Sequence, residues 1–317
     1  MPVIELDKVS KDFVHHRRAG RLRRERVRTH AVHEVSLNVE PGEVVGYIGP
    51  NGAGKSTTIK MLTGILVPSS GRVRVAGLDP QVNRVALARR IGVVFGHRTQ
   101  LWWDLPLSDS FDLLRYVYRV PAERHRANLT AFVDLLNLGH LLDRPVRQLS
   151  LGERMRGELT AALLHDPTIL YLDEPTIGLD IVSKARVSDF LAEVNRERGV
   201  TVVLTTHDLD DVEQLCSRLV VIDHGRIVLD STIEEVKRTH APHRTLVVDL
   251  KDASSEICVP GVEVTKVEGP RQWLRFHHED HTASGVIAAV AATCELVDIS
   301  VVEPDIEDVI RHIYGVV

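Results

Sequence analysis

Three short motifs in the first two-thirds of the chain occur in an order that few folds can use. Residues 49–56 have the form G-x-x-x-x-G-K-[ST], which is a phosphate-binding loop when a strand precedes it and a helix follows it. The run LSLGE at residues 149–153 lies ahead of an apolar strand candidate at residues 169–172, which ends in Asp173 and Glu174. A helix that starts at Ser150 can bind an anion at its positive end. The order therefore predicts a nucleotide-binding α/β fold with two anion sites in each chain.

The phosphate-binding loop has the context that its chemistry needs. Apolar residues 44–48 predict the strand before it, and residues 56–66 predict the helix after it. Glycines let successive backbone N–H groups turn toward one centre, and the helix adds its positive end. We expect Lys55 to reach the β- and γ-phosphates and Ser56 to bind Mg²⁺. The expected nucleotide contacts are Gly49, Pro50, Asn51, Gly52, Ala53, Gly54, Lys55, Ser56 and Thr57.

Two later strand ends carry groups suited to hydrolysis. Asp173 can hold the metal from the side opposite the loop, and Glu174 can polarise the attacking water if the turn brings it to the γ-phosphate. The alternative for Glu174 is a capping acid before Pro175. His207 follows the strand expected at residues 201–204 and can hydrogen-bond the γ-phosphate, although a histidine there can also be an ordinary turn residue.

The LSLGE run supports two compatible interpretations. Ser150 as N-cap and Glu153 three positions later form the pattern of a capping box, which stabilises a helix start. A helix start with the Ser150 hydroxyl and Gly152 is also an anion site. This second site lies too far from the loop to share its phosphate, so the phosphate must come from another subunit.

The length and pattern of the chain predict two domains. Strand and helix candidates alternate up to about residue 230, which indicates a mostly parallel sheet with helices packed on it, and a helical lobe is expected at about residues 98–160. Residues 1–238 form this first domain in our prediction. Residues 239–317 are expected to form a small α+β accessory domain.

The composition limits the location and the partners. No apolar run approaches the roughly 18 to 20 residues that span a bilayer, the N-terminus has no signal-peptide pattern, and the three cysteines form no C-x-x-C pair. A reducing cytoplasm fits these features. The net charge of −5 gives no general attraction to nucleic acid, so no nucleic-acid partner is expected. The arginine-rich residues 15–28 predict a solvated hairpin extension or, alternatively, a basic patch at an anionic membrane surface.

The motifs resemble those of the ATP-binding cassette ATPases, from residue 3 to about residue 238. The resemblance implies that residues 49–57 are the Walker A loop, residues 149–153 the signature and residues 178–180 the D-loop. It implies that His207 is the switch histidine and that Phe13 stacks on adenine. Such cassettes work with ATP and Mg²⁺ as head-to-tail pairs, in which each signature closes on the nucleotide of the other subunit.

Within this family, residues 48–58 and 101–106 resemble the ATPase subunits of bacterial multidrug or antibiotic exporters. This resemblance implies separate hydrophobic permease subunits, a homodimer or a paralogous cassette partner, and a peripheral position on the cytoplasmic face of the membrane. One alternative is a soluble cassette that acts on nucleic acid or ribosomes. The other is a cassette that binds ATP but hydrolyses it weakly.

Three residues depart from the family pattern. Leu151 stands where glycine is usual, Glu153 stands where glutamine is usual, and His97 occupies the position of the glutamine that senses Mg²⁺. We assign the metal-sensing role to His97, with Gln100 as the alternative.

Trp102 and Trp103 follow Gln100 directly. The two indoles are expected to pack into the helical lobe, or else to form a groove for a helix of the membrane subunit.

Overall fold

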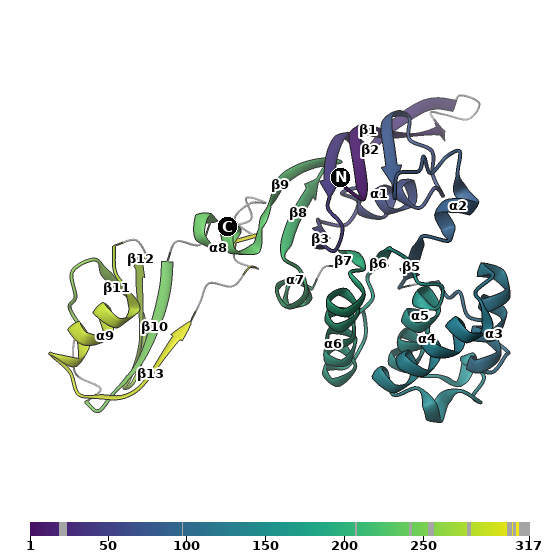
Figure 1. Ribbon diagram of the computed structural model, residues 1–317. Coiled ribbons are helices and arrows are strands. Elements are labelled where there is room, and N and C mark those ends of the chain that lie inside the picture. The colour runs from purple at the N-terminus through teal and green to yellow at the C-terminus, as the bar shows by residue number, and fades with distance from the viewer. Residues whose placement is uncertain are drawn as a thin grey trace. The chain divides into compact units, whose positions relative to one another are not determined.

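The computed structural model describes residues 1–18, 24–96, 98–206, 208–240, 243–252, 257–277, 280–302, 306 and 309–310, with side chains omitted for 15–18, 24–26 and 240. These residues form two compact units, Met1–Ser231 and Thr232–Val317 (Figure 1). The division falls at the end of strand β9 (Arg226–Thr232), just before helix α8 (Ile233–His240). The boundary expected after residue 238 lies inside α8.

A six-stranded sheet forms the centre of the first unit. Its strands follow the order β5-β6-β7-β3-β8-β9, and the pairs β5–β6, β6–β7, β7–β3 and β3–β8 are parallel. The bounds are β3 (Val44–Ile48), β5 (Ile91–Phe95), β6 (Ile169–Asp173), β7 (Thr201–Thr205) and β8 (Arg218–Asp223). Strand β7 is buried along its whole length and β6 up to its last residue, as expected for parallel strands covered on both faces.

A second sheet packs over the first helix of the unit. It is antiparallel, has the order β2-β1-β4, and consists of β1 (Ile4–Arg18), β2 (Arg24–Val39) and β4 (Ser70–Val75). Helix α1 (Lys55–Leu62) buries Ile59, Met61 and Leu62 in one hydrophobic core shared by both sheets. The phosphate-binding loop is therefore held between two sheets. On either side of residues 19–23, which lie outside the described residues, the arginine-rich run continues the antiparallel pairing of β1 and β2 up to Arg18 and Arg24, as the hairpin interpretation predicts. The alternative, contact with a membrane surface, is not tested.

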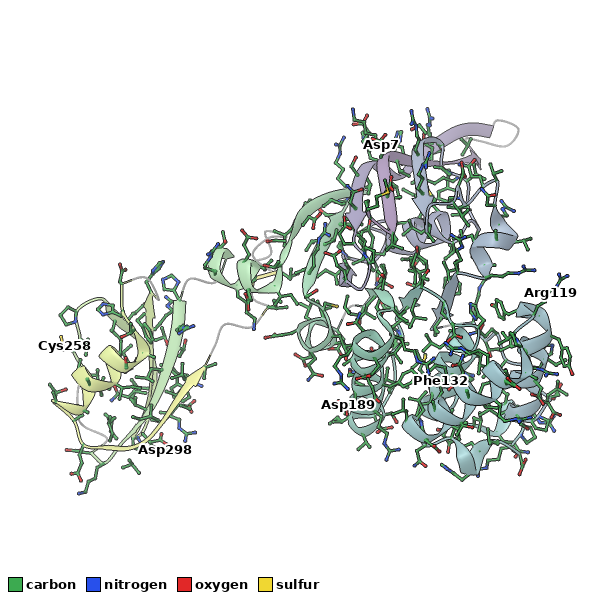
Figure 2. The ribbon with its side chains drawn as sticks, viewed as in Figure 1. Asp7, Arg119, Phe132, Asp189, Cys258 and Asp298 are labelled. Atoms are coloured by element: carbon green, nitrogen blue, oxygen red, sulfur yellow. The ribbon has the colours of Figure 1, made fainter. Side chains whose placement is uncertain are left out.

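The remaining helices of the unit include the helical lobe. They are α2 (Arg84–Ala88), α3 (Leu107–Tyr118), α4 (Ala122–Leu135), α5 (Leu151–Leu163), α6 (Ile181–Arg198) and α7 (Leu209–Leu215), with 3-10 turns η1 (Gly139–Leu141) and η2 (Val146–Gln148). Phe132 of α4 lies inside the lobe (Figure 2) and meets the edge of the Phe190 ring of α6, with 5.7 Å between ring centroids. The Arg198 guanidinium lies 4.3 Å from the Phe132 ring centroid.

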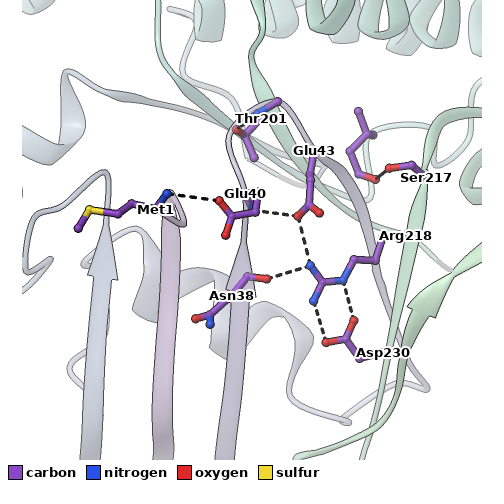
Figure 3. Close-up of polar contacts among 10 residues, drawn as sticks. Met1, Asn38, Glu40, Glu43, Thr201, Ser217, Arg218 and Asp230 are labelled. Carbon is purple, nitrogen blue, oxygen red and sulfur yellow. Dashed lines mark hydrogen bonds and ion pairs between the residues drawn. The ribbon is translucent and has the colours of Figure 1, made fainter.

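One guanidinium joins the two sheets at their shared edge (Figure 3). Arg218, at the start of β8, donates to both carboxylate oxygens of Asp230 on β9, at 2.7 and 2.8 Å. It also donates to the Asn38 carbonyl on β2 at 2.9 Å and to Glu43 Oε2 at 3.2 Å. This planar fork can satisfy several acceptors at once, which an ammonium group cannot do with the same geometry.

The second unit has its own core. Strands β10 (His243–Leu250), β11 (Val262–Glu268), β12 (Arg271–His277) and β13 (Leu296–Val302) form an antiparallel sheet in the order β11-β12-β10-β13. Helix α9 (Ala283–Ala291) buries Val286 and Val290 against it. The expected C-terminal helix is described only at Ile306, Val309 and Ile310. In the described part of the chain, no helix is long and apolar enough to cross a membrane.

Phe132→Ala should destabilise the first unit by about 3–5 kcal/mol, because it removes a fully buried ring and leaves a cavity beside Phe190. Urea denaturation followed by fluorescence and far-UV circular dichroism measures the change, with the transition of each unit fitted separately. Leu135→Ala, at an exposed position of the same helix, is the control and should cost less than about 1 kcal/mol. Equal losses in the two variants would contradict the packing described.

Candidate active site

A cavity of about 730 Å³ opens at the carboxyl ends of the parallel strands, which is where open α/β sheets place their ligands. Most of the residues expected from the sequence to contact the nucleotide or its metal line this cavity. They are Pro50, Asn51, Gly52, Gly54, Lys55, Ser56, Thr57, Asp173 and Glu174. Gly49 and the buried Ala53 complete the loop behind this surface.

The loop between β3 and α1 can take its shape only with glycine at two positions. A Cβ on Gly49 would overlap the Ile222 carbonyl, and one on Gly54 would overlap the Ala31 carbonyl. Gly54 also has φ of 111°, a conformation that other residues rarely adopt. No side chain caps α1 at Gly54. The first N–H groups of the helix, which form the positive end of the helix dipole, therefore face the cavity side of the loop. This arrangement suits phosphate.

Lys55 lies at the centre of the loop. Its Nζ donates to the carbonyls of Gly49, at 2.5 Å, and Pro50, at 3.2 Å. Burial lowers the pKa of the Lys55 amine from its ordinary value of 10.5, and the negative charges of Glu174 and Asp173 oppose the shift. An anion bound beside this amine would favour its charged form further.

Two of the three residues expected to hold the metal, Ser56 and Asp173, contact each other, and the third, His97, lies outside the described residues. Ser56 Oγ donates to Asp173 Oδ1 at 3.4 Å, and Thr205 Oγ1 donates to the same oxygen at 2.6 Å. A hydroxyl and a carboxylate are oxygen ligands of the kind Mg²⁺ prefers, and Mg²⁺ completes its octahedron with phosphate oxygens and water. The residues present therefore fit a Mg²⁺–phosphate complex bridged between Ser56 and Asp173.

Glu174 adopts a backbone conformation that brings it to the same cavity as Asp173. Neighbouring side chains of a strand point to opposite faces, but Glu174 has φ of 56°, in the left-handed region. Its N–H donates to the Thr205 carbonyl at 2.8 Å. A Cβ on Gly96 would lie 2.6 Å from the Glu174 carbonyl, so the residue that follows β5 must be glycine for this turn to fit.

Six cavity residues were not expected from the sequence. They are Ala31, Lys60, Phe95, Gly96, Arg98 and Ile177. Helix periodicity could have found Lys60, which lies four positions after Ser56 on the same face of α1. Arg98 follows the end of β5, the strand next to β6, so strand order could have found it. Ala31 comes from the antiparallel sheet, and no local pattern connects it to the loop.

Two expected residues, His97 and His207, lie outside the described residues, so the structure does not test them. Two others do not line the cavity. Phe13, which is 40% exposed, is not among the described residues that line it. Gln100 donates through Nε2 to the Glu158 carbonyl at 3.2 Å and lines a neighbouring cavity instead.

The signature turn, residues 149–153, lies apart from this cavity, and Ser150 and Gly152 are not among the described residues that line it. The predicted capping box is present. Ser150 Oγ accepts from the Glu153 N–H at 3.2 Å, and the Ser150 N–H donates to Glu153 Oε2 at 2.8 Å. The backbone hydrogen bond from Ser150 lowers the pKa of Glu153 against the opposing effect of burial. The carboxylate of Glu153 therefore caps its own helix, and the Ser150 hydroxyl keeps its proton available to another acceptor.

The fold and the cavity define a P-loop ATPase, and similarity to known proteins gives the family. A family profile described as "ABC transporter" matches residues 32–177. The daunorubicin resistance ATP-binding protein DrrA3 of Streptomyces coeruleorubidus is 34% identical over 292 residues, which are 90% of this chain and 91% of that protein. The methionine import ATP-binding protein MetN of Latilactobacillus sakei subsp. sakei (strain 23K) is 31% identical over 300 residues, 90% of this chain and 85% of that protein. The chain belongs to the ATP-binding cassette (ABC) transporter family, among its ATP-binding subunits.

Similarity to solved structures supports the same family assignment. The structure of cbiO1 from Clostridium perfringens, described as part of the ABC transporter complex cbiONQ, has a TM-score of 0.64 at 28% identity and covers 75% of this chain and 91% of that chain. The ATP-binding cassette MJ0796, in a dimeric post-hydrolysis state bound to ADP and Pi, has a TM-score of 0.62 at 25% identity and covers 73% of this chain and 98% of that chain. The family, the P-loop ATPase fold, and ATP hydrolysis with Mg²⁺ are thereby confirmed as predicted.

Glu153→Gln should leave the ATPase rate within about 3-fold of the wild type, because glutamine can also accept from the Ser150 N–H and complete a capping box. Glu153→Ala removes that bond and should lower the free energy of unfolding by about 1 kcal/mol. Steady-state phosphate release and urea denaturation measure the two effects. A large gain in rate for Glu153→Gln would mean that the carboxylate had been repelling the nucleotide.

Proposed function

We propose that this chain is the ATP-hydrolysing subunit of an export system whose membrane-spanning helices belong to separate permease chains. It would work as a pair of cassettes on the cytoplasmic face of the membrane, attached through those permeases. Residues 1–238 would carry the ATP chemistry, with residues 239–317 as an accessory domain. Similarity to DrrA3 across nearly the whole chain supports the export assignment. MetN matches over an equal share of the chain, so the direction of transport needs a direct test.

The observation that carries the permease assignment is a pair of exposed indoles. Trp102 and Trp103 are 40% and 48% exposed, and the Arg154 guanidinium of α5 lies 5.6 Å from the Trp103 ring centroid, so the indoles are partly exposed while Trp103 also contacts the helical lobe. Their backbone is held from both sides, because the Trp102 N–H donates to Ser110 Oγ at 3.2 Å and the Trp103 carbonyl accepts from the Arg147 N–H at 3.0 Å. These hydrogen bonds fix the backbone of the turn that carries the two indoles.

The surroundings of the indoles suit a helix from a partner chain. In sequence they follow Arg98, which lines both the nucleotide cavity and a neighbouring cavity of about 340 Å³. That second cavity lies between the sheet and the helical lobe and is lined also by Ile65 and Tyr118. Large apolar side chains fixed in an exposed position are typical of an interaction surface. A permease helix docked here would contact the segment that leaves the nucleotide cavity.

The geometry of the cavity supports the proposed hydrolytic roles. Lys55 binds the β- and γ-phosphates, and the residues of the loop bind the triphosphate through their N–H groups. Bound Mg²⁺, held by Ser56 and Asp173, would neutralise charge on the phosphate oxygens. Glu174 accepts a proton from the attacking water.

The remaining assigned roles concern residues outside the cavity. His207 binds the γ-phosphate, His97 senses the metal, and Phe13 stacks on adenine. Ser150 and Gly152 bind the nucleotide of the other subunit in a head-to-tail pair. The two alternatives have less support: the relatives named above are transporter subunits, and Glu153, one of the three departures that suggested weak hydrolysis, is accounted for by its capping bond.

Glu174→Gln should reduce ATP turnover by about 100-fold or more, because the amide cannot accept the proton of the attacking water. ADP affinity, measured by calorimetry, should stay unchanged. Turnover equal to that of the wild type would exclude Glu174 as the base.

Ser150→Arg should abolish the ATP-dependent dimer, because a large cation would occupy the place proposed for the partner's phosphate. Binding of ADP at Lys55 should change by less than about 2-fold, since Ser150 lies outside that cavity. Size-exclusion chromatography of the variant in the Glu174→Gln background measures the dimer. Loss of nucleotide binding together with the dimer would contradict the shared-site arrangement.

Trp102→Ala combined with Trp103→Ala should reduce recovery of the chain with the permeases encoded beside it, after co-expression and membrane isolation. The Leu135→Ala variant, at an exposed site of α4, is the control and should bind normally. Inside-out membrane vesicles, whose cytoplasmic face is open to added ATP, then decide between export and import. ATP-dependent uptake of daunorubicin is expected, and ATP-dependent release of preloaded methionine would contradict the export assignment.

A further inference from the structure

A second cavity, of about 900 Å³, opens at the amino ends of the parallel strands and belongs to the first unit alone. Arg90 and Thr168 stand directly before β5 and β6, and Thr201 is the first residue of β7; all three line this cavity. The nucleotide cavity lies at the opposite ends of the same strands, and the two cavities share no described residue. A volume of this size is typical of small-molecule sites. The chain therefore offers a second place for a ligand, which the ATP chemistry does not use.

Three arginines from separate elements line the second cavity. Arg90 precedes β5, Arg124 lies on α4, and Arg198 ends α6. Arg90 Nη1 donates to the Ala76 carbonyl at 2.8 Å. Arg124 Nε and Arg198 Nη1 donate to the two carboxylate oxygens of Asp166, at 2.6 and 3.2 Å. In the described part of the chain, the remaining guanidinium nitrogens of these arginines contact no acceptor, so each arginine keeps donors for a ligand.

Packing and hydrogen bonds hold Arg198 and its surroundings in place. The Arg198 guanidinium lies 4.3 Å from the Phe132 ring centroid, and its Nη1 also donates to Asn128 Oδ1 at 3.0 Å. Asn128 lines the cavity, is only 3% exposed, and donates through its own amide to the Leu164 carbonyl at 3.1 Å. Asp166 has φ of 53°, a left-handed turn conformation that aspartate tolerates. The two guanidiniums that share Asp166 are therefore placed before a ligand arrives, which lowers the cost of ordering them on binding.

Positive charge is in excess in the second cavity. Asp166 lies between two guanidiniums and can offset only one of their charges. Glu197, the other described acid that lines the cavity, accepts from Arg196 Nε at 3.0 Å, and Arg196 lies outside the described lining. Among the described residues, Arg90 contacts a carbonyl and no carboxylate. Two positive charges therefore remain, one from the guanidiniums that share Asp166 and one from Arg90.

The rest of the lining is mostly apolar. It includes the buried Leu163 and Val200, together with Val3, Ala127 and Pro167. Small-molecule sites typically combine such a wall with a few polar groups that fix the orientation of the ligand. A bare inorganic ion would leave this wall uncovered, so the lining favours an organic anion.

We propose that the second cavity binds a small phosphomonoester. Arg90, Arg124 and Arg198 hold its phosphate group, and its organic body covers the apolar wall. A phosphomonoester carries about −1.5 to −2 charges at neutral pH, which matches the excess positive charge, whereas a monocarboxylate would leave part of that charge without a partner. A guanidinium presents parallel N–H groups that fit two phosphate oxygens. The proposal does not depend on the proposed function, because this ligand lies outside the nucleotide cavity.

Phenyl phosphate is a suitable probe, because it joins a phosphomonoester to a flat apolar body. Calorimetric titration of the full chain, with saturating ADP in the nucleotide cavity, should show saturable binding at one site per chain. Arg124→Gln and Arg90→Gln should each weaken this binding by about 10-fold or more, because each removes charge-assisted hydrogen bonds to the phosphate. Arg147→Gln, which removes an exposed arginine outside the cavity lining, is the matched control and should bind as the wild type does.

Chemical modification tests the same site in the wild-type chain, where no variant needs to fold. Phenylglyoxal reacts with accessible guanidiniums, and mass spectrometry measures the rate at each arginine. The side chains of Arg124 and Arg147 are 60% and 55% exposed, so they form a matched pair. In the presence of ADP, phenyl phosphate should slow the modification of Arg124 and leave that of Arg147 unchanged.

Four results would each overturn the proposal. The first is binding of phenyl phosphate that disappears when ADP is added, since the probe would then occupy the nucleotide cavity. The second is an affinity that neither Arg124→Gln nor Arg90→Gln reduces. The third is equal slowing of modification at Arg124 and Arg147. The fourth is equal affinity for inorganic phosphate and phenyl phosphate, which would rule out an organic ligand held by the apolar wall.

Discussion

Strands β5, β6 and β7 end at the same level of the sheet, and this alignment determines where the polar groups of the nucleotide cavity lie. Phe95, Asp173 and Thr205 are direct partners across the parallel sheet, so the segments that follow them all begin at one edge. The register of these buried strands is fixed, because a shift of one residue would move every side chain of the strand to the opposite face of the sheet. Asp173 then accepts from Thr205, and Glu174 donates its N–H to the same residue. The chemistry of the site is therefore a consequence of strand pairing in the core.

Much of this arrangement could be read from the sequence, because its signals are local. The phosphate-binding loop, the carboxylates after β6 and the capping box each occupy a few consecutive residues, and their spacing predicts their geometry. Lys60 and Arg98 follow from helix periodicity and strand order. The general tendency of large aromatic residues to be buried does not predict how much of Trp102 and Trp103 stays exposed, because that depends on how the helical lobe packs around them.

The departures from the family pattern find different explanations. The Glu153 carboxylate accepts a hydrogen bond from the Ser150 N–H, and its negative charge is favourable because it lies beside a helix start. Leu151 fills the space over Gly178, so in this chain the usual glycine would leave a gap at the junction with α6. The two changes thus support helix capping and packing at the signature turn.

The left-handed backbone conformation of Glu174 affects how the residue at this position could evolve. A residue with φ of 56° is strained unless it is glycine, asparagine or aspartate. In the proposed function Glu174 is the base, so its replacement by asparagine would relieve this strain and remove the base in one step. A nucleotide site that holds ATP without cleaving it would then be a single substitution away.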